Sequence, residues 1–194
     1  PSELDRYPEG LEEQKEFGDE QFIVRPIRSD DADRLMRFFY THDTETVYGR
    51  YRFPKQSMPR EEAVRLCTMD YKTRFAIGVF RDAGKNIELV AIGRYEGDET
   101  SKVAEPAFVV HEKFRRRGMA NYLYERLRAR AASCGLTSFE GSFSIENRAS
   151  IELHRRRGND VYYSDGLYWY QDSLEKLESP ETLELGETST SLST

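Results

Sequence analysis

The chain has 194 residues, of which 38% are hydrophobic and 33% charged, with a formal net charge of −6. This length and composition fit one medium-sized domain with a packed core. They exclude a membrane-spanning helix, which needs about 20 consecutive apolar residues, and the acidic amino end is unlike a secretory signal, so we expect a cytoplasmic protein and no membrane partner.

The charge is distributed unevenly along the chain. Residues 1–20 carry eight acidic and two basic side chains, and residues 175–194 carry five acidic and one basic. Such polar segments are typical of tails. We therefore expect an acidic tail at 1–20, one domain at 21–174 and an acidic, Ser/Thr-rich tail at 175–194. The mildly basic domain favours a small anion, and the acidic tails argue against nucleic acid as a partner.

The first half of the chain predicts a strand, two helices and a hairpin. These are a strand at 21–28, a helix from Asp30 or Asp31 to about Thr41, a helix beginning at Pro59 or Arg60, and strands at 74–80 and 87–95. Alternation of apolar and polar residues indicates the strands, and apolar residues at helical spacing indicate the helices. Gly84 lies in the turn that joins the last two strands into an antiparallel hairpin.

The second half continues the alternation of strands and helices. It predicts a strand at 103–110, a helix at 119–133, a strand at 137–144, a helix at 148–157 and a closing hairpin of strands 161–164 and 167–173. The helix at 119–133 has one apolar face and ends before Gly135. The elements together predict one α/β domain with a mixed central sheet of about 6–7 strands and helices on both faces.

The loop Arg115–Ala120 lies between a predicted strand and the strongest predicted helix. The first N–H groups of a helix have no intrahelical partner and bind phosphate oxygens. Gly118 allows close approach to the backbone, and three arginines add positive charge. Taken alone, the same residues also fit a tight turn beside a solvated cluster of arginines.

Two motifs resemble the Gcn5-related N-acetyltransferase (GNAT) family. The R-x-x-G-x-A pattern of Arg115–Ala120 looks like the family's pyrophosphate signature, and Asn147–Gly158 resembles its closing N-x-x-A-x-x-L-Y-x-x-x-G pattern. The likeness extends from about Phe22 to Tyr170. It implies the GNAT fold and acetyl-CoA as the cofactor.

A closer likeness is to bacterial protein lysine acetyltransferases that modify acyl-CoA synthetases. Three short segments carry it: Val24–Asp31, Tyr48–Phe53 and Ala104–Val110. The likeness implies an amine acceptor, and specifically a lysine of an acyl-CoA synthetase. It leaves the oligomeric state open.

The resemblance also implies a set of residues that contact the cofactor. They are Phe108, Val109, Val110, Arg115, Arg116, Arg117, Gly118, Met119, Ala120, Asn147 and Ser150. The backbone of Val109 and Val110 is expected to face the acyl and pantetheine groups, with the N–H of Val109 as an oxyanion donor. Asn147 either orients pantetheine or only caps the helix that follows it.

Glu105 is the candidate general base. A lysine amine has a solution pKa of about 10.4 and attacks a thioester only when neutral, so it needs a proton acceptor. The alternative is an ordinary carboxylate at a strand edge. Pro106 is unusual inside a central strand, and we expect strand pairing to begin after it, which would leave Glu105 near an opening.

His154 stands where the family has a tyrosine that protonates the departing thiolate. An imidazolium could serve instead, although the alternatives are a surface histidine or an acid supplied by Tyr162, Tyr163 or Tyr168. Three scattered histidines and two distant cysteines give no metal-ligand spacing, so no metal is expected.

These observations favour direct acetyl transfer from acetyl-CoA to an amine, with a protein lysine as the first candidate acceptor. Two alternatives remain: an enzyme that acts on a small amine or a protein N-terminus, and a non-catalytic module that binds acyl-CoA and regulates a partner. We expect the segment Thr41–Met58 to form part of the acceptor wall.

Overall fold

The structure is a computed structural model that describes residues 7–42 and 57–174. Its core is one mixed sheet of eight strands in the order β1-β2-β3-β4-β5-β6-β8-β7. The strands are β1 (Glu13–Phe17), β2 (Glu20–Pro26), β3 (Arg74–Asp82), β4 (Ile87–Gly97), β5 (Val103–Val110), β6 (Ser138–Ser144), β7 (Asp160–Ser164) and β8 (Leu167–Ser173). The expected number of about 6–7 strands is therefore too low.

Four α-helices occur in the described residues: α1 (Ala32–Tyr40), α3 (Arg60–Cys67), α4 (Met119–Ser133) and α5 (Arg148–Arg156). Short 3₁₀ turns are η2 (Glu9–Leu11), η3 (Ser29–Asp31) and η4 (Glu112–Phe114). None of these helices combines the length and the apolar character needed to cross a membrane. The predicted helix at 119–133 is confirmed with the same bounds.

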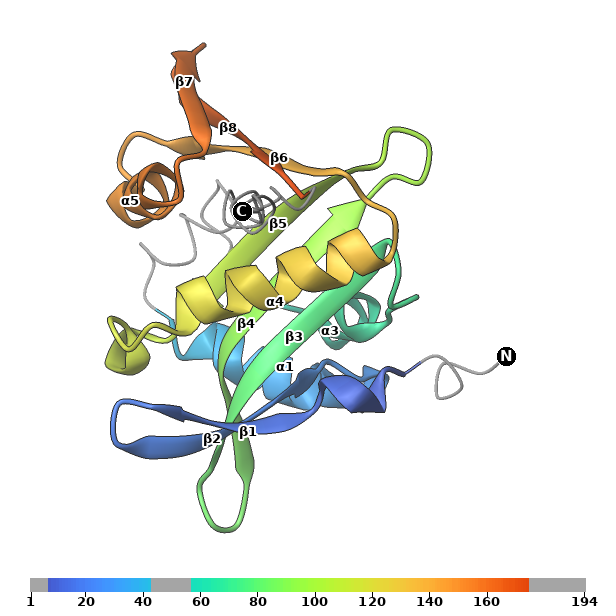
Figure 1. Cartoon of the computed structure of the whole chain (residues 1–194). Coiled ribbons are helices and arrows are strands. Elements are labelled where there is room, and N and C mark those ends of the chain that lie inside the picture. The colour runs from blue at the N-terminus through green and yellow to red at the C-terminus, as the bar shows by residue number, and fades with distance from the viewer. Residues whose placement is uncertain (1–6, 43–56, 175–194) are drawn as a thin grey trace, which may run out of the picture.

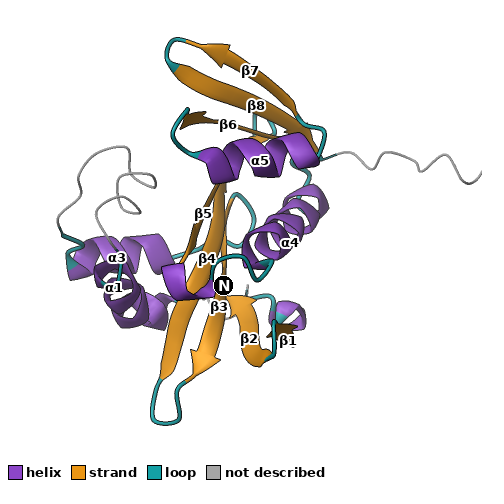
Figure 2. Ribbon diagram, turned by 90° about the vertical axis from the view of Figure 1, so that its left-hand side faces the viewer, coloured by secondary structure: helices purple, strands orange, loops and turns teal. Residues whose placement is uncertain are grey.

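Helices cover both faces of the central strands, with α1 and α3 on one side and α4 on the other (Figures 1 and 2). Because both faces are covered, β3 and β4 are buried along most of their length and read as continuous apolar runs. Helix α4 buries one stripe of side chains against the sheet: Met119, Leu123, Tyr124, Leu127 and Ala131.

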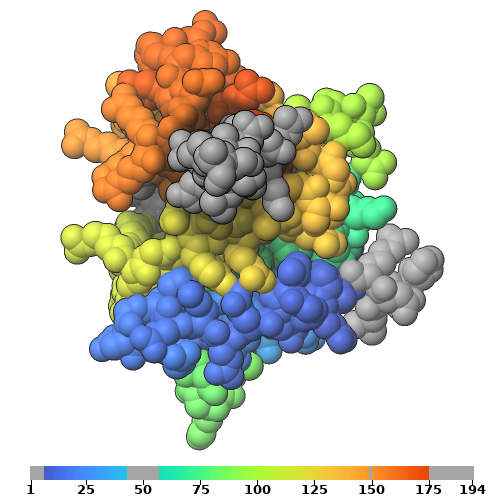
Figure 3. Space-filling model, in the orientation of Figure 1, coloured from blue at the N-terminus to red at the C-terminus, as the bar shows by residue number. Residues whose placement is uncertain are grey.

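The amino-terminal segment belongs to the fold from residue 7 onward, so the tail expected at 1–20 is wrong for residues 7–20. Strand β1 pairs with β2, and Figure 3 shows this blue segment packed beside the yellow α4. Glu13 forms an ion pair with Arg126 at 2.7 Å, and Glu20 forms one with Arg117 at 3.1 Å. The acidic residues that suggested a solvated tail thus pair with arginines of α4 and the loop before it.

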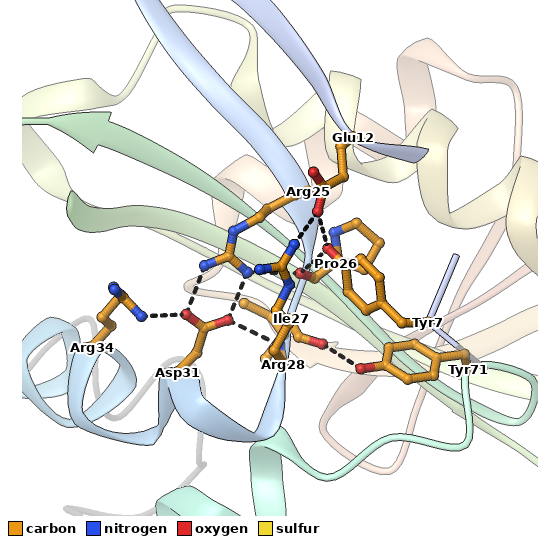
Figure 4. A network of polar contacts seen from close by, with 9 residues as sticks. All are labelled: Tyr7, Glu12, Arg25, Pro26, Ile27, Arg28, Asp31, Arg34 and Tyr71. Carbon is orange, nitrogen blue, oxygen red and sulfur yellow. Dashed lines mark hydrogen bonds and ion pairs between the residues drawn. The ribbon is translucent and has the colours of Figure 1, made fainter. Parts of the chain in front are cut away.

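A polar network ties β2 to the start of α1 (Figure 4). Asp31 is fully buried and accepts two hydrogen bonds from Arg25, both at 2.7 Å, and one from the Arg28 N–H at 2.9 Å. Burial raises the pKa of Asp31, but these hydrogen bonds outweigh it and hold the pKa below its ordinary value. Arg28 also pairs with Glu12, which joins the segment before β1 to the network.

The sheet is continuous but has one narrow junction. Strands β5 and β6 pair in parallel at only two positions, Val103 with Ser138 and Ala104 with Phe139. Beyond Ala104, β5 continues beside β4, whereas β6 continues beside β8. The two halves of the sheet therefore diverge, and Figure 1 shows β6, β8 and β7 rising away from β5.

Candidate functional site

The divergence of β5 from β6 leaves one edge of β5 without a neighbouring strand after Ala104, within the part of the chain that the structure describes. In the β4–β5 ladder, the N–H of Asp98 bonds the C=O of Val103, and the N–H of His111 bonds the C=O of Val90, both at 2.9 Å. Hydrogen-bonded pairs alternate along an antiparallel ladder. The odd-numbered residues of β5 therefore direct their backbone groups toward β4, and the even-numbered residues direct theirs toward the open edge.

This alternation of backbone directions explains why the strand tolerates a proline at position 106, and it corrects two expectations. The missing N–H of Pro106 lies on the open edge, where no strand needs it. Pairing with β4 does not begin after Pro106, because Glu105 already opposes Glu96 in the register. Val109 directs its N–H toward Ile92 of β4, so it is not the free donor that we expected. The N–H groups of Phe108 and Val110 face the open edge instead.

The loop before α4 has the geometry of an anion site. The first intrahelical bond joins the N–H of Tyr122 to the C=O of Gly118 at 3.0 Å, so the N–H groups before it have no intrahelical partner. Gly118 has a φ of 84°, and a Cβ placed there would meet nothing within 4 Å. Arg116 also has a positive φ, 60°. Open space beside backbone amides that have no intrahelical partner is what a pyrophosphate needs.

The three arginines of this loop differ in their surroundings. Arg116 is exposed, and Arg115 is exposed with its Nε donating to the C=O of Val110 at 3.4 Å. Arg117 is half-buried between Glu20 and Phe114, with its guanidinium 5.0 Å from the phenyl ring. Arg117 therefore holds the amino-terminal hairpin, and the charge that faces solvent comes from Arg115 and Arg116.

The next two residues of the loop can act only through their backbone or by being small. Met119 is 1% exposed, so its side chain belongs to the core and its N–H is what remains for a ligand. Ala120 is half-buried on the first turn of α4. Both fit a helix terminus that a ligand approaches end-on.

Asn147 caps α5, since its Oδ1 accepts a hydrogen bond from the N–H of Ser150 at 3.1 Å. The cap occupies only the oxygen of the carboxamide. The amide nitrogen of Asn147 and the hydroxyl of Ser150 remain on the first turn of α5, the element that follows the diverging strand β6. Capping and pantetheine binding are therefore compatible roles.

A cavity of about 720 Å³ lies where β5 and β6 separate. Four carboxylate residues line it: Glu96, Asp98, Glu105 and Glu140. The described residues around it include no Lys, Arg or His, whereas Tyr162 and Trp169 supply aromatic walls. The cavity therefore attracts cations and offers apolar surface to a hydrocarbon stem.

The carboxylate of Glu140 has a fixed position in this cavity. Its Oε1 accepts hydrogen bonds from Gln171 at 3.0 Å and from Ser138 at 3.2 Å. Glu140 is the first residue of β6 beyond the β5–β6 ladder, as Glu105 is on β5. The two carboxylates thus flank the point where the strands part.

His154 is neither a surface residue nor an accessible imidazolium. It is 3% exposed, and its Nδ1 lies 3.0 Å from the amide nitrogen of Asn159. Burial, with a smaller effect of Arg157, lowers the pKa of His154 to about 4. The imidazole is therefore neutral near pH 7, which does not fit the expected role of a charged proton donor.

Most residues that line the cavity, among them Glu140 and Tyr170, were absent from the predicted site. Tyr170 faces Gly141 in the β6–β8 register, and both line the cavity with Glu105. Only the pairing of the closing hairpin with β6 brings them there, and sequence periodicity does not reveal which strands pair. Among the described residues, no cluster of three His, Cys, Asp or Glu side chains could hold a metal ion.

Comparison with known proteins gives a consistent result. The family model described as acetyltransferase (GNAT) domain matches residues 21–159. The GNAT domain of Streptomyces lividans PAT is 25% identical, covers 86% of this chain and 99% of its own, and superposes with a TM-score of 0.77.

Two further structures share the fold at lower identity. The structure of yncA from Salmonella typhimurium with its cofactor acetyl-CoA is 15% identical, covers 83% of this chain and 98% of its own, and has a TM-score of 0.63. A cAMP-binding acyltransferase from Mycobacterium smegmatis is 18% identical, with a TM-score of 0.60, and the match covers 87% of this chain and 48% of that one.

Proposed function

Because the chain belongs to the GNAT acetyltransferase family and is an acetyl-CoA-dependent N-acetyltransferase, we propose that its acceptor is a protein lysine and that Glu105 is the general base. The observation that carries this proposal is the acidic cavity at the separation of β5 and β6. Its described lining has four carboxylate residues and no basic side chain.

The cavity suits a cation carried on a hydrocarbon stem. An approaching lysine brings a positive ammonium group, which Glu96, Glu105 and Glu140 attract. Its methylene stem can lie against Tyr162 and Trp169, whose rings also favour a nearby cation. The resemblance to acetyltransferases of acyl-CoA synthetases makes a lysine of such an enzyme the first protein acceptor to test.

Glu105 has the position that a base requires. It lies on β5 immediately after the last β5–β6 pair, exposed in the cavity, and on the same strand as the open-edge amides of Phe108 and Val110. A carboxylate there can take the proton that the amine nitrogen loses as it bonds to the acetyl carbon. The N–H of Phe108 or Val110 can stabilise the oxyanion that develops on the acetyl oxygen.

The residues that would hold the cofactor follow from the same geometry. The amides at the start of α4, with Arg115 and Arg116, would bind the pyrophosphate, and Asn147 and Ser150 would face the pantetheine arm. Bound acetyl-CoA supplies the activated acetyl group. A short polyamine also fits a cation-attracting cavity of about 720 Å³, so a small amine is the second candidate acceptor.

The test compares three acceptors at equal concentration: a lysine peptide, spermidine, and a peptide whose only free amine is its N-terminus. Acetylation is followed by mass spectrometry and by release of the coenzyme A thiol, and a purified acyl-CoA synthetase is then tried as protein acceptor. We expect the lysine peptide to be acetylated fastest. Faster acetylation of spermidine or of the N-terminus would contradict the lysine assignment.

The acidic cavity itself is tested with Glu140→Gln. The neutral side chain keeps the size of the original, so we expect a higher KM for the cationic acceptor and an unchanged KM for acetyl-CoA. An unchanged acceptor KM would mean that the amine does not enter this cavity.

A further inference from the structure

Tyr170 combines a buried ring with a hydroxyl that makes no hydrogen bond to a described residue. The residue is 6% exposed, and its hydroxyl has no hydrogen-bond partner in the part of the chain that the structure describes. A tyrosine hydroxyl at the wall of a cavity can donate to a bound ligand or to water. Since Tyr170 lines the cavity that holds Glu105, the group that pairs with this hydroxyl can be part of a ligand.

The ring of Tyr170 reaches from its own strand to the edge of the gap. Tyr170 on β8 opposes Gly141 on β6. A Cβ placed on Gly141 would lie 3.0 Å from both Cε1 and the hydroxyl oxygen of Tyr170. The far end of the ring therefore lies over β6, the strand that borders the gap, and it can do so because residue 141 has no side chain.

The ring of Tyr170 is also held in place by its packing against α5. The imidazole of His154 stacks on it with 3.7 Å between ring centroids and 23° between planes. Two residues along β8, Asp172 accepts hydrogen bonds from Arg128 at 2.6 Å and from Tyr124 at 2.7 Å, which fixes β8 to α4. The hydroxyl thus has a defined position beside Gly141 of β6.

Resting on the proposed acetyl transfer, we propose that Tyr170 is the catalytic acid, donating its phenolic proton to the sulfur of coenzyme A as the carbon–sulfur bond breaks. His154, which occupies the place of the family's usual tyrosine, is then a positioning residue that supports the ring. In this proposal the hydroxyl of Tyr170 on β8 takes the role that the family's tyrosine has at the position of His154 on α5.

The lysine ammonium first releases one proton to solvent, because only the neutral amine attacks the thioester, and the remaining protons balance within the cavity. The amine nitrogen bonds to the acetyl carbon, and the electron pair of the broken carbon–sulfur bond goes to sulfur. Glu105 takes the proton that nitrogen loses, while Tyr170 protonates the sulfur, and Glu105 returns a proton to the phenolate through cavity water. Burial, with the nearby Glu105 and Asp172, raises the pKa of Tyr170, so the hydroxyl keeps its proton at neutral pH and is available as a donor.

The first experiment needs no acceptor. Coenzyme A is bound to the wild-type chain, to Tyr170→Phe and to Tyr163→Phe, and the thiol is titrated by the ultraviolet absorbance of its thiolate. Tyr163, one of the alternative acids considered from the sequence, is the matched control because it lies in the same hairpin but is 59% exposed and outside the cavity lining. A donor to the thiolate should make the thiol pKa lower by about 1–2 units in wild type and Tyr163→Phe than in Tyr170→Phe. Equal values in all three overturn the proposal.

The second experiment measures turnover with the best acceptor. We expect Tyr170→Phe to lower kcat by about 100-fold while KM for acetyl-CoA and the affinity for coenzyme A stay within a factor of about two. Gly141→Ala, which displaces the hydroxyl, should lower kcat in the wild-type background but not further in the Tyr170→Phe background.

The outcomes separate the two proposals. A wild-type chain that binds coenzyme A but acetylates no amine contradicts the proposed function, while the thiol titration still decides the role of Tyr170. Transfer by the wild type together with an unchanged kcat in Tyr170→Phe overturns the acid assignment alone and leaves Tyr170 as a packing residue.

Discussion

Glu96 and Glu105 are direct cross-strand partners in the β4–β5 ladder, so both carboxylates leave the sheet on the same face. Like charges placed directly opposite each other destabilise a sheet. Their common place in the lining of one cavity is consistent with the role proposed for that cavity, which is to attract the acceptor and to accept its proton.

Removing the charge of Glu105 should abolish most of the turnover. Glu105→Gln keeps the shape but cannot accept a proton, so kcat should fall by about 10²–10⁴-fold with acetyl-CoA affinity unchanged by calorimetry. Glu88→Gln is the control, because Glu88 lies near the other end of β4 in an exposed ion pair with Arg81. Wild-type turnover in Glu105→Gln would show that another group removes the proton.

A negative charge at Gly118 should prevent cofactor binding. In Gly118→Glu the carboxylate would enter the open space before α4 and repel the pyrophosphate, weakening acetyl-CoA binding by at least about 100-fold. Gly84→Glu is a matched control, since Gly84 also has a positive φ, 82°, and a Cβ added to it would likewise meet nothing within 4 Å. If both variants bind acetyl-CoA as the wild type does, the loop is only a tight turn.

Two substitutions distinguish the capping role of Asn147 from its proposed role in cofactor binding. Asn147→Ser keeps an N-cap oxygen but loses the amide nitrogen, whereas Asn147→Ala loses both and should cost about 1 kcal/mol of stability. We expect Asn147→Ser to retain the thermal stability of the wild type and to bind acetyl-CoA more weakly. Equal affinity of Asn147→Ser and wild type would leave Asn147 with the capping role alone.

The burial of His154 predicts a loss of stability in mild acid. Its folded pKa, lowered to about 4, lies below the ordinary value of about 6.5, so the unfolded chain binds the proton more readily. Neutral His154 makes its full contribution to the free energy of unfolding above pH 6.5. This contribution falls by about 3 kcal/mol in total as the pH is lowered toward 4. Urea unfolding at several pH values should show a shallower decline in this window for His154→Phe. Parallel curves would mean that His154 does not titrate in this way.

The buried ion pair of Arg25 and Asp31 should be costly to break. Asp31→Asn leaves Arg25 without its charged partner, and loss of one member of a buried pair costs about 3–5 kcal/mol. Because the folded pKa of Asp31 is lowered, its contribution is present above the unfolded value and is lost only as pH falls through the folded value. Chemical denaturation near neutral pH should therefore show the full loss. A change below about 1 kcal/mol would assign the pair to the weak class of surface pairs.

Much of the fold could be predicted from local sequence signals. The apolar stripe and terminal Gly135 predict α4 with its observed bounds, and the turn around Gly84 predicts the β3–β4 hairpin. Strand β1 was missed because its burial pattern leaves only Phe17 buried, so its charges resemble those of a tail. Its pairing with β2 and its ion pairs to Arg126 and Arg117 depend on tertiary contacts.

The site could be predicted only in part for the same reason. The anion loop is one contiguous motif, and Gly118 shows the positive φ that such a loop requires. The donor role of Val109 failed because ladder parity decides which amides are free, and Tyr170 was missed because its place depends on strand pairing. The segment 43–56, with the Tyr48–Phe53 likeness and most of the expected acceptor wall, lies outside the described residues.

The narrow junction between β5 and β6 has a mechanical consequence. Within residues 7–42 and 57–174, two ladder positions, Val103–Ser138 and Ala104–Phe139, are the only direct strand-to-strand link between the five strands on one side and the three on the other. Thermal opening of the sheet can begin at this short β5–β6 ladder, since local stability depends on the number of interactions that must be broken. The amides of β6 near Ser138 should therefore exchange with deuterium sooner than those in the centres of β3 and β4, and a bound ligand that bridges both sides should slow that exchange.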